Sequence, residues 1–245
     1  MEFISQSNPT KTKQVTRKEF CLLIGNSRWH WAIHQENQWK FLHTYPAPKK
    51  LNSILQSLSK WAAVGPIPNE IKLDPSKCVK LQNIPLNNLP KWLGIDRALV
   101  GWAAFEKAKS KNLHNKGILI ADAGTILSLT CINSKGEFKG GQLVAGMQLQ
   151  RSLMSEGAKK LNPVKRENIP KIQFPISTEE AMLRGSFQAL LGVLIEAQNA
   201  AKMPLWLCGG DSEILFDHLK DRISNLYLCP NLVLEAIIKI ELKAK

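Results

Sequence analysis

The sequence predicts an α/β fold made of two related halves. In the first half, the apolar run 20–24 ends at Gly25, and a segment of alternating apolar and polar residues follows. In the second half, the apolar run 117–121 leads to Gly124 and to the alternating segment 126–132. An alternation with a period of two is typical of a half-buried strand. Because both halves begin with a strand–turn–strand unit, we expect a duplicated architecture.

The rest of the first half combines helices with irregular segments. Apolar residues recur at helical spacing over 51–64, which predicts a helix there. Several prolines interrupt residues 65–92, so loops and short strands are expected. A further helix is predicted over 95–109, where the apolar residues can share one face.

The second half follows a polar break at 112–116, our candidate domain boundary. Residues 133–136 have the composition of a hairpin turn. Ser177, followed three residues later by Glu180, is a capping-box signal that opens a long helix. The other expected elements are a strand at 138–143, a helix at 147–160, no clear element over 162–177, a strand at 205–208 and a helix at 232–242.

With 245 residues, the chain has room for one large domain or two small ones. We expect a disordered basic tail at 1–18, an N-terminal domain at 19–115 and a C-terminal domain at 116–245. The tail lacks the apolar middle of a secretory signal. Nowhere does an apolar run reach the length of about 18 residues that predicts a membrane span.

Charge and cysteine content narrow the class of protein. The chain has 33 lysines and arginines against 20 acidic residues, and a net charge of +13 can attract polyanions. The basic residues crowd 107–116 and 159–171 without interleaved aromatic residues for base stacking, so a solvated surface is favoured over a nucleic-acid site. Five cysteines without a CxxC pair argue against a zinc site or a disulfide framework and favour a reducing cytoplasm.

Three glycine turns are candidate nucleotide-binding elements. They are Gly25-Asn26-Ser27, Gly124-Thr125 and Gly209-Gly210. Glycine lets backbone N–H groups approach an anion, and the neighbouring hydroxyls add donors. The chain contains no GxxxxGK[ST] loop, and each turn taken alone is more simply explained as an ordinary chain reversal.

A carboxylate and a guanidinium stand together at a predicted helix start, in the segment Leu93-Gly94-Ile95-Asp96-Arg97. Asp96 can cap the helix N-terminus, or it can accept a proton from a substrate hydroxyl during phosphoryl transfer. Arg97 can pair with a carboxylate or phosphate through two parallel hydrogen bonds. Spacing alone leaves both interpretations of Asp96 open.

Several segments, in this order, resemble the type III pantothenate kinases. They are Ile24-Gly25-Asn26-Ser27, the segment 93–97, Asp122-Ala123-Gly124-Thr125 with Gly140-Gly141 and Gly146, Ser177-Thr178-Glu179-Glu180-Ala181, Gly209-Gly210-Asp211, and 230–235. The similarity extends over residues 20–240, and the order of the motifs is more specific than any one of them. Gly-Asn-Ser-Arg followed by His-Trp-Ala is similar to the cyanobacterium-like members.

The resemblance implies the duplicated ribonuclease-H-like fold of the acetate and sugar kinase, Hsp70 and actin superfamily. It also implies ATP-dependent phosphorylation of pantothenate to 4'-phosphopantothenate, the first step of coenzyme A biosynthesis. Members act as homodimers that share the active site across subunits. The implied cofactors are ATP, Mg²⁺, and K⁺ or NH₄⁺, and the implied location is the cytoplasm.

The same resemblance implies roles for individual residues. ATP is expected to bind at Gly25, Asn26, Ser27, Arg28, Gly124, Thr125, Gly209 and Gly210. Pantothenate is expected to bind at Gly94, Ile95, Asp96, Arg97 and Thr178, with Asp96 as the general base. Asp122 resembles the monovalent-cation ligand. For Thr178, helix capping beside Ser177 is the alternative.

Three positions depart from the family pattern. Leu23 replaces an aspartate that helps to organise the metal-bound phosphates, Thr130 replaces a second aspartate, and Ala145 replaces a proline. The change at Leu23 bears directly on how the metal is held.

Two other functions remain open. Leu23 and the positive charge also suit a non-enzymatic regulator or nucleic-acid-binding protein on a kinase fold, because fold does not determine function. Salt-sensitive nucleic-acid binding without ATP turnover would favour that alternative. A kinase of another small alcohol, such as a sugar, would retain Asp96 and the ATP turns, but pantothenate would not compete for its site.

Overall fold

The computed structural model describes residues 18–164 and 168–243, so the predicted tail, apart from Lys18, lies outside the described residues. The strands form two sheets. The first contains β1 (Glu19–Ile24), β2 (Trp29–Gln35), β3 (Gln38–Thr44) and β4 (Leu58–Ala63) in the order β3-β2-β1-β4. The second contains β5 (Ile118–Ala123), β6 (Ile126–Ile132), β7 (Phe138–Ala145), β8 (Leu205–Cys208) and β9 (Leu226–Leu228) in the order β7-β6-β5-β8-β9.

The two sheets repeat one topology. In each sheet, three successive strands pair antiparallel, and the next strand returns to lie parallel to the first. Ile24 pairs with Trp29, and Ala123 pairs with Leu127, so each sheet carries its first glycine turn at the corresponding end. This repeat confirms the predicted duplicated, ribonuclease-H-like α/β fold.

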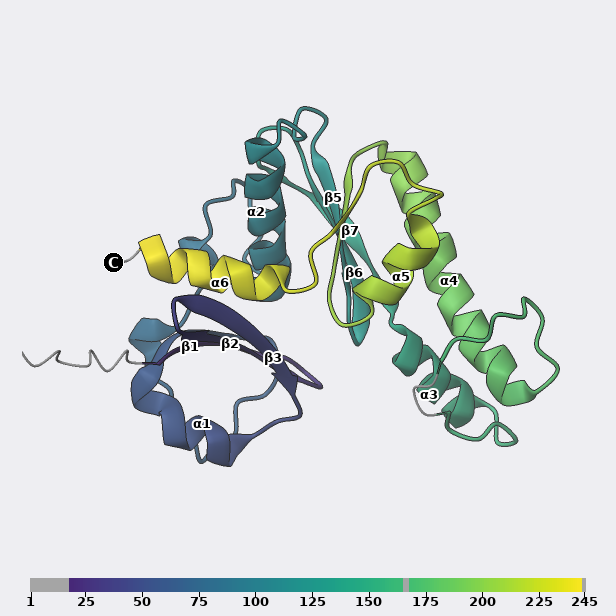
Figure 1. Ribbon diagram of the computed structural model, residues 1–245, viewed down its shortest axis with the longest axis horizontal. Coiled ribbons are helices and arrows are strands. Elements are labelled where there is room, and N and C mark those ends of the chain that lie inside the picture. Colours follow the sequence, from purple (N-terminus) through teal and green to yellow (C-terminus); the bar gives the residue numbers. More distant parts are fainter. Residues whose placement is uncertain (1–17, 165–167, 244–245) are drawn as a thin grey trace, which may run out of the picture.

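Helices α2 and α6 lie between the two sheets (Figure 1). The α-helices are α1 (Pro48–Ile54), α2 (Ile95–Ser110), α3 (Met147–Gly157), α4 (Thr178–Ala201), α5 (Ser212–Leu219) and α6 (Leu232–Lys243). One buried core cluster runs from Leu23 of the first sheet through Leu99 and Ile237 of these helices to Ile120 of the second sheet. The central helices therefore hold the two sheets in a defined relation.

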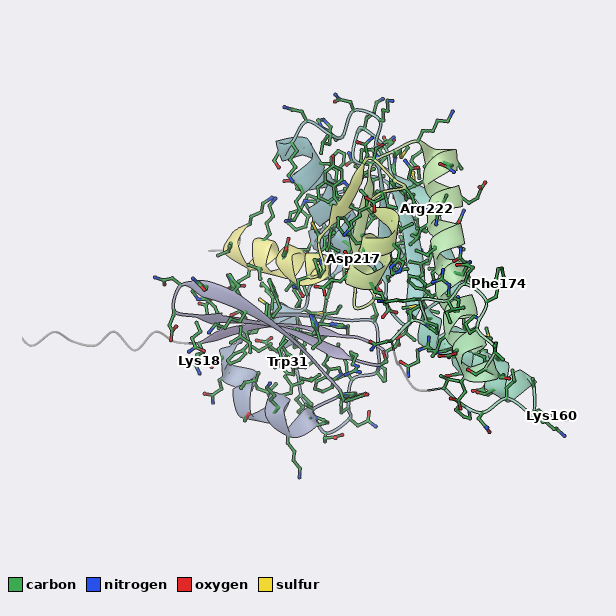
Figure 2. The ribbon with its side chains drawn as sticks, turned by 45° about the vertical axis from the view of Figure 1, so that its right-hand side comes forward. Lys18, Trp31, Lys160, Phe174, Asp217 and Arg222 are labelled. Carbon is green, nitrogen blue, oxygen red and sulfur yellow. The ribbon has the colours of Figure 1, made fainter. Side chains whose placement is uncertain are left out.

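The outer faces of the sheets have separate cores. Trp31 is fully buried with Leu51 of α1 on the outer face of the first sheet, and Figure 2 shows it inside that lobe. Helices α3, α4 and α5 cover the outer face of the second sheet through residues such as Met147, Leu190 and Leu215. Among the described residues, no helix has the length and apolarity needed to cross a membrane. All five cysteines are free thiols.

The predicted helix over 51–64 is wrong beyond its first turn. Helix α1 ends at Ile54, a short 3-10 helix (Leu55–Ser57) follows, and the chain then continues as β4. Leu58 and Trp61 pack into the outer core, while Ala62 packs into the central core, so both faces of β4 are buried. Parallel pairing with β1 thus overrides the helical spacing of the sequence.

The other predicted elements form close to their expected positions. Strands β1, β2 and β5 to β8 and helices α2, α3, α4 and α6 are confirmed. Residues 65–92 form loops with two 3-10 helices, Pro75–Lys77 and Leu81–Asn83, and single bridges instead of the expected short strands. Strand β3, helix α5 and strand β9 form without a corresponding prediction.

The predicted division at residues 115 and 116 separates the strands of the two sheets but not the helices. Helix α6 belongs to the C-terminal half of the chain, yet it packs against β1 and β4 of the first sheet. Helix α2 belongs to the N-terminal half, yet it packs against β5 and β6. The domain boundary therefore stays a prediction.

Candidate active site

The first two glycine turns lie side by side. Ser27 Oγ and Thr125 Oγ1 are 2.6 Å apart and share a hydrogen bond, although the two residues are 98 positions apart in the chain. Both hydroxyls are exposed. Because each sheet carries its first turn at the corresponding end, the duplicated topology brings the turns together. Two exposed hydroxyls on glycine turns therefore meet at one point, which suits a polyphosphate.

The Gly25 turn is tight because other backbone segments approach it closely. The Gly25 N–H donates to the Arg28 carbonyl at 3.0 Å, and a Cβ on Gly25 would lie 2.6 Å from that oxygen. Gly65 lies against the Gly25 carbonyl so closely that a Cβ on Gly65 would collide with it. Gly65 is absent from the predicted site. The glycine–proline dipeptide at this position indicates a turn, but it does not show where that turn packs.

The third turn divides into a packed glycine and an open one. Gly209 has a φ of +88°, and a Cβ there would collide with the Asp122 carboxylate and the Ala123 carbonyl. A Cβ on Gly210 would meet nothing within 4 Å. Gly209 is therefore required by packing and backbone conformation, while Gly210 leaves space beside the site for a ligand.

Asp122 is a half-buried residue near the end of β5, on the face that packs against α2 and α6. The carboxylate shares a hydrogen bond with the Cys208 side chain, which acts to lower its pKa. Burial outweighs this and raises the pKa of Asp122 from 3.8 to about 7, with a further contribution from the negative charge of Asp96. The ionised form of Asp122 is thus poorly stabilised and would gain from a bound cation.

Asp96 lies in the first turn of α2. The N-cap residue is Gly94, which offers no side chain, so the interpretation of Asp96 as the N-cap is wrong. Asp96 Oδ1 does accept a hydrogen bond of 2.8 Å from the Arg97 N–H, and a Cβ on Gly94 would lie 2.5 Å from that oxygen. Burial raises the pKa of Asp96, opposed by this hydrogen bond and by the Arg97 charge. A carboxylate with a raised pKa is a better proton acceptor.

The Arg97 guanidinium is anchored to the second sheet. Its Nε donates to Thr130 Oγ1 at 3.1 Å, and its Nη2 donates to the Leu129 carbonyl at 3.2 Å. The guanidinium carbon lies 5.7 Å from the centre of the Phe138 ring. Gly141 makes room for this arrangement, because a Cβ there would lie 2.5 Å from Nη2. Thr130 accepts a hydrogen bond without cancelling the positive charge, which leaves that charge available to a substrate anion.

Thr178 begins a helix in a different layer of the molecule from Asp96. Ser177 is the N-cap of α4, and its Oγ accepts from the Glu180 N–H at 3.2 Å, so the capping alternative for Thr178 is wrong. Thr178 is exposed. Helix α4 covers the outer face of the second sheet, whereas Asp96 and α2 lie on its inner face.

The structure adds a pair of histidines that the sequence prediction lacks. His30 follows the Gly25 turn on β2, and its cross-strand partner on β3 is His43. The sequence analysis did not predict that His30 and His43 pair, because it predicted no strand where β3 forms. The alternation of residues 29–35 was the available signal, since it puts His30 on the face opposite Trp29 and Trp31.

The chain is similar to known proteins over most of its length. Residues 47–199 match the model of the type III pantothenate kinase family. The type III pantothenate kinase of Synechococcus sp. (strain JA-3-3Ab) is 28% identical over 222 residues, which cover 88% of each chain. That of Thermosynechococcus vestitus is 29% identical over 217 residues, covering 84% of this chain and 82% of the relative.

A solved structure shows the same fold. It is described as a conserved Baf family transcriptional activator from Campylobacter jejuni, and it superposes with a TM-score of 0.60 at 17% identity. The match covers 92% of this chain and 98% of the other. At this identity the likeness concerns the fold alone.

Proposed function

This chain belongs to the type III pantothenate kinase family, and from this premise we propose that it uses ATP to phosphorylate the primary hydroxyl of pantothenate in the cytoplasm. The product is 4'-phosphopantothenate, for coenzyme A biosynthesis. One observation carries the proposal beyond similarity. The Gly25 and Gly124 turns meet at the Ser27–Thr125 hydrogen bond, and Asp96 lies close enough for its charge to raise the pKa of Asp122, beside the second turn.

The nucleotide is held by the glycine turns. The Ser27 and Thr125 hydroxyls act as donors to the phosphate oxygens, whereas the Gly25 and Gly124 N–H groups already donate to the Arg28 and Ile126 carbonyls within their turns. The open side of Gly210 accommodates the ribose or adenine. Arg28 follows the first turn, and its guanidinium lies 3.8 Å above the Tyr45 ring, which orders the cation beside the phosphates.

Pantothenate is held at the start of α2. Asp96 accepts the hydroxyl proton as that oxygen attacks the γ-phosphate in line, a role worth about 10²- to 10⁴-fold in rate. The Arg97 guanidinium, fixed by Thr130 and Leu129, binds the pantothenate carboxylate with the donors that it does not use for anchoring. The site thus provides a base and an anion clamp on one helix turn.

A divalent metal fits this site as a companion of the nucleotide. Among the described residues, no group of three or more histidines, cysteines or carboxylates is arranged to hold an ion. Mg²⁺ needs few ligands from the protein when it is bound mainly through the nucleotide phosphates, whose charge it neutralises. Asp122 is the proposed ligand for K⁺ or NH₄⁺, because a cation would offset the cost of ionising a buried carboxylate.

A homodimer would complete the substrate site. Thr178 lies away from Asp96 in its own chain, so it contributes to the site of a second copy. The segment before it exposes apolar side chains, with Ile172 at 68% and Phe174 at 85% exposure, and Figure 2 shows Phe174 on the surface beside α4. Exposed apolar side chains next to an isolated site residue support an interface there. Sedimentation equilibrium tests the dimer, and a monomer at micromolar concentration would contradict it.

The proposed function is tested by a coupled assay with purified protein, ATP and pantothenate, with and without K⁺ or NH₄⁺. We expect ATP consumption that depends on pantothenate and that rises with the monovalent cation. A small sugar that supports faster ATP consumption than pantothenate would favour the kinase of another alcohol. Salt-sensitive binding of DNA or RNA with no ATP turnover would favour the non-enzymatic alternative.

A further inference from the structure

His30, His43 and Asn231 form a chain of three side chains beside the Gly25 turn. The Nδ1 atoms of the two histidines are 2.8 Å apart. His43 Nε2 lies 3.0 Å from Oδ1 of Asn231, which directly precedes α6. The chain therefore links the first sheet to the C-terminal helix across 188 positions of sequence.

In the orientation that Asn231 has in the structure, its Oδ1 faces His43 Nε2, and for two neutral rings this orientation implies one pair of tautomers. An amide oxygen only accepts hydrogen bonds, so His43 Nε2 carries a proton and His43 Nδ1 is an acceptor. The proton between the two rings must then belong to His30 Nδ1. Consequently His30 Nε2 is the unprotonated nitrogen of the ring. Burial lowers the pKa of His30 to about 4, with smaller contributions from His43 and Arg28, which keeps the ring neutral at pH 7.

The unprotonated nitrogen faces the first glycine turn. A Cβ on Gly25 would lie 3.4 Å from His30 Nε2. Within the described part of the chain, no hydrogen bond to Nε2 is formed, and Nε2 is not one of the buried polar atoms that lack a partner. An accessible lone pair is thus held in place beside the proposed phosphate site. His30 is also the cross-strand partner of Leu23, where the family resemblance leads one to expect an aspartate.

We propose that His30 Nε2 is a ligand of the divalent cation that accompanies the nucleotide phosphates, and that His43 and Asn231 are positioning residues that hold its tautomer. The proposal rests on the proposed function for the presence of a nucleotide. A metal-bound histidine usually donates its other N–H to an acceptor, which is the part that His43 plays here. A nitrogen ligand shifts metal preference from Mg²⁺ toward Co²⁺ and Zn²⁺.

Pulsed EPR tests this coordination without any measurement of turnover. The probe is Mn²⁺ with a non-hydrolysable ATP analogue, bound to protein in which histidine alone carries ¹⁵N. We expect a ¹⁵N coupling of the size found for a coordinated imidazole. The label excludes the adenine nitrogens as its source. Absence of the coupling in the wild-type nucleotide complex would overturn the proposal, and this outcome needs no variant that might fail to fold.

Variants assign the coupling to one histidine. His30→Gln should abolish it, whereas His34→Gln, on the same face of β2 but farther from the turn, should leave it unchanged. If the coupling survives His30→Gln, the ligand is another histidine and the proposal is wrong. His43→Phe and Asn231→Leu should weaken Mn²⁺ binding to the nucleotide complex about 10- to 100-fold. Unchanged affinity in both would overturn the positioning role.

Metal preference gives a second, independent readout. In calorimetric titrations of the nucleotide complex, His30→Asp should bind Mg²⁺ more tightly and Co²⁺ more weakly than the wild type, because a carboxylate suits the harder ion. An unchanged ratio of the two affinities would contradict coordination. These results are separable from the proposed function, since a protein that phosphorylates pantothenate but shows no histidine coupling refutes only the coordination.

Discussion

The Gly25 turn and the Gly124 turn occupy equivalent places in the two halves, yet they differ in chemistry. Their backbones are alike. Gly65 lies against the Gly25 carbonyl, and Gly146 lies against the Gly124 carbonyl, and neither position has space for a Cβ. In both halves, a second glycine therefore allows a close approach of backbone to the turn.

The side chains around the two turns are opposite in character. Beside the first turn are Arg28 and the neutral imidazole of His30, whereas beside the second are Asp122 and Asp96. Burial lowers the pKa of His30 and raises that of Asp122, because in each case it disfavours the charged form. The duplicated backbone thus provides two similar turns, and the residues near them decide which half has a neutral imidazole beside its turn and which has carboxylates.

The largest expected effect concerns Asp96, one of the two carboxylates beside the Gly124 turn. Asp96→Asn should lower kcat by about 10²- to 10⁴-fold, because it removes the proposed proton acceptor. Asparagine can still accept the Arg97 N–H, and it removes a charge that burial disfavours, so the thermal unfolding temperature should not fall below that of the wild type. Steady-state kinetics and calorimetry check both parts. Wild-type turnover in the variant would show that Asp96 is not the base, and Asp122 would be the next candidate.

The two turns should also give opposite dependences of stability on pH. Asp122 has a pKa of 3.8 when unfolded and about 7 when folded, so the folded state binds more protons in this range and the free energy of unfolding falls as pH rises. His30 has a pKa of 6.5 when unfolded and about 4 when folded, so its contribution rises with pH over that range. Each slope is at most about 1.4 kcal/mol per pH unit.

Denaturant unfolding between pH 4.5 and 7.5 separates the two contributions. Asp122→Asn should make the free energy of unfolding rise more steeply with pH than in the wild type, and His30→Gln should make it rise less. The same change of slope in both variants would contradict the opposite effects of burial on the pKa values of Asp122 and His30.

Gly65 and Gly146, which lie against the carbonyls of the two turns, should have equivalent effects on stability. Gly65→Ala and Gly146→Ala should each destabilise the protein by about 1–3 kcal/mol, because the added Cβ displaces the turn backbone. Gly185→Ala is the control, since its Cβ would meet nothing within 4 Å, and in the middle of α4 it should stabilise by up to about 1 kcal/mol. If only one of the Gly65→Ala and Gly146→Ala variants is destabilised, the two turns do not have the same packing.

The smallest expected effect is the coupling between the turns. Ser27→Ala and Thr125→Val, alone and together, form a double-mutant cycle for the hydrogen bond that joins the two halves. We expect a coupling free energy of about 0.5–1 kcal/mol in denaturant unfolding, because both hydroxyls are exposed. Additive effects would mean that the hydroxyls do not contact each other in the absence of nucleotide.

Local patterns predicted most of the elements, and long-range pairing explains the failures. Helix α4 was predictable because its start depends on a contact within one turn, from the Glu180 N–H to Ser177. Strand β4 was not, because its helical spacing competes with pairing to β1, about forty residues away in sequence. Strand β3 was missed as well, and with it the pairing of His43 to His30.

The sequence by itself determined the composition of the turns, the repeat of strand–turn–strand units and the family to which the chain belongs. These features depend on residue type and on spacing over a few positions. Only the tertiary structure decided that Ser27 contacts Thr125, that Asn231 contacts His43, and that burial raises the pKa of Asp122 to about 7. The reason is that proximity and burial arise from packing two sheets around α2 and α6, and packing joins residues whose separation in sequence carries no signal.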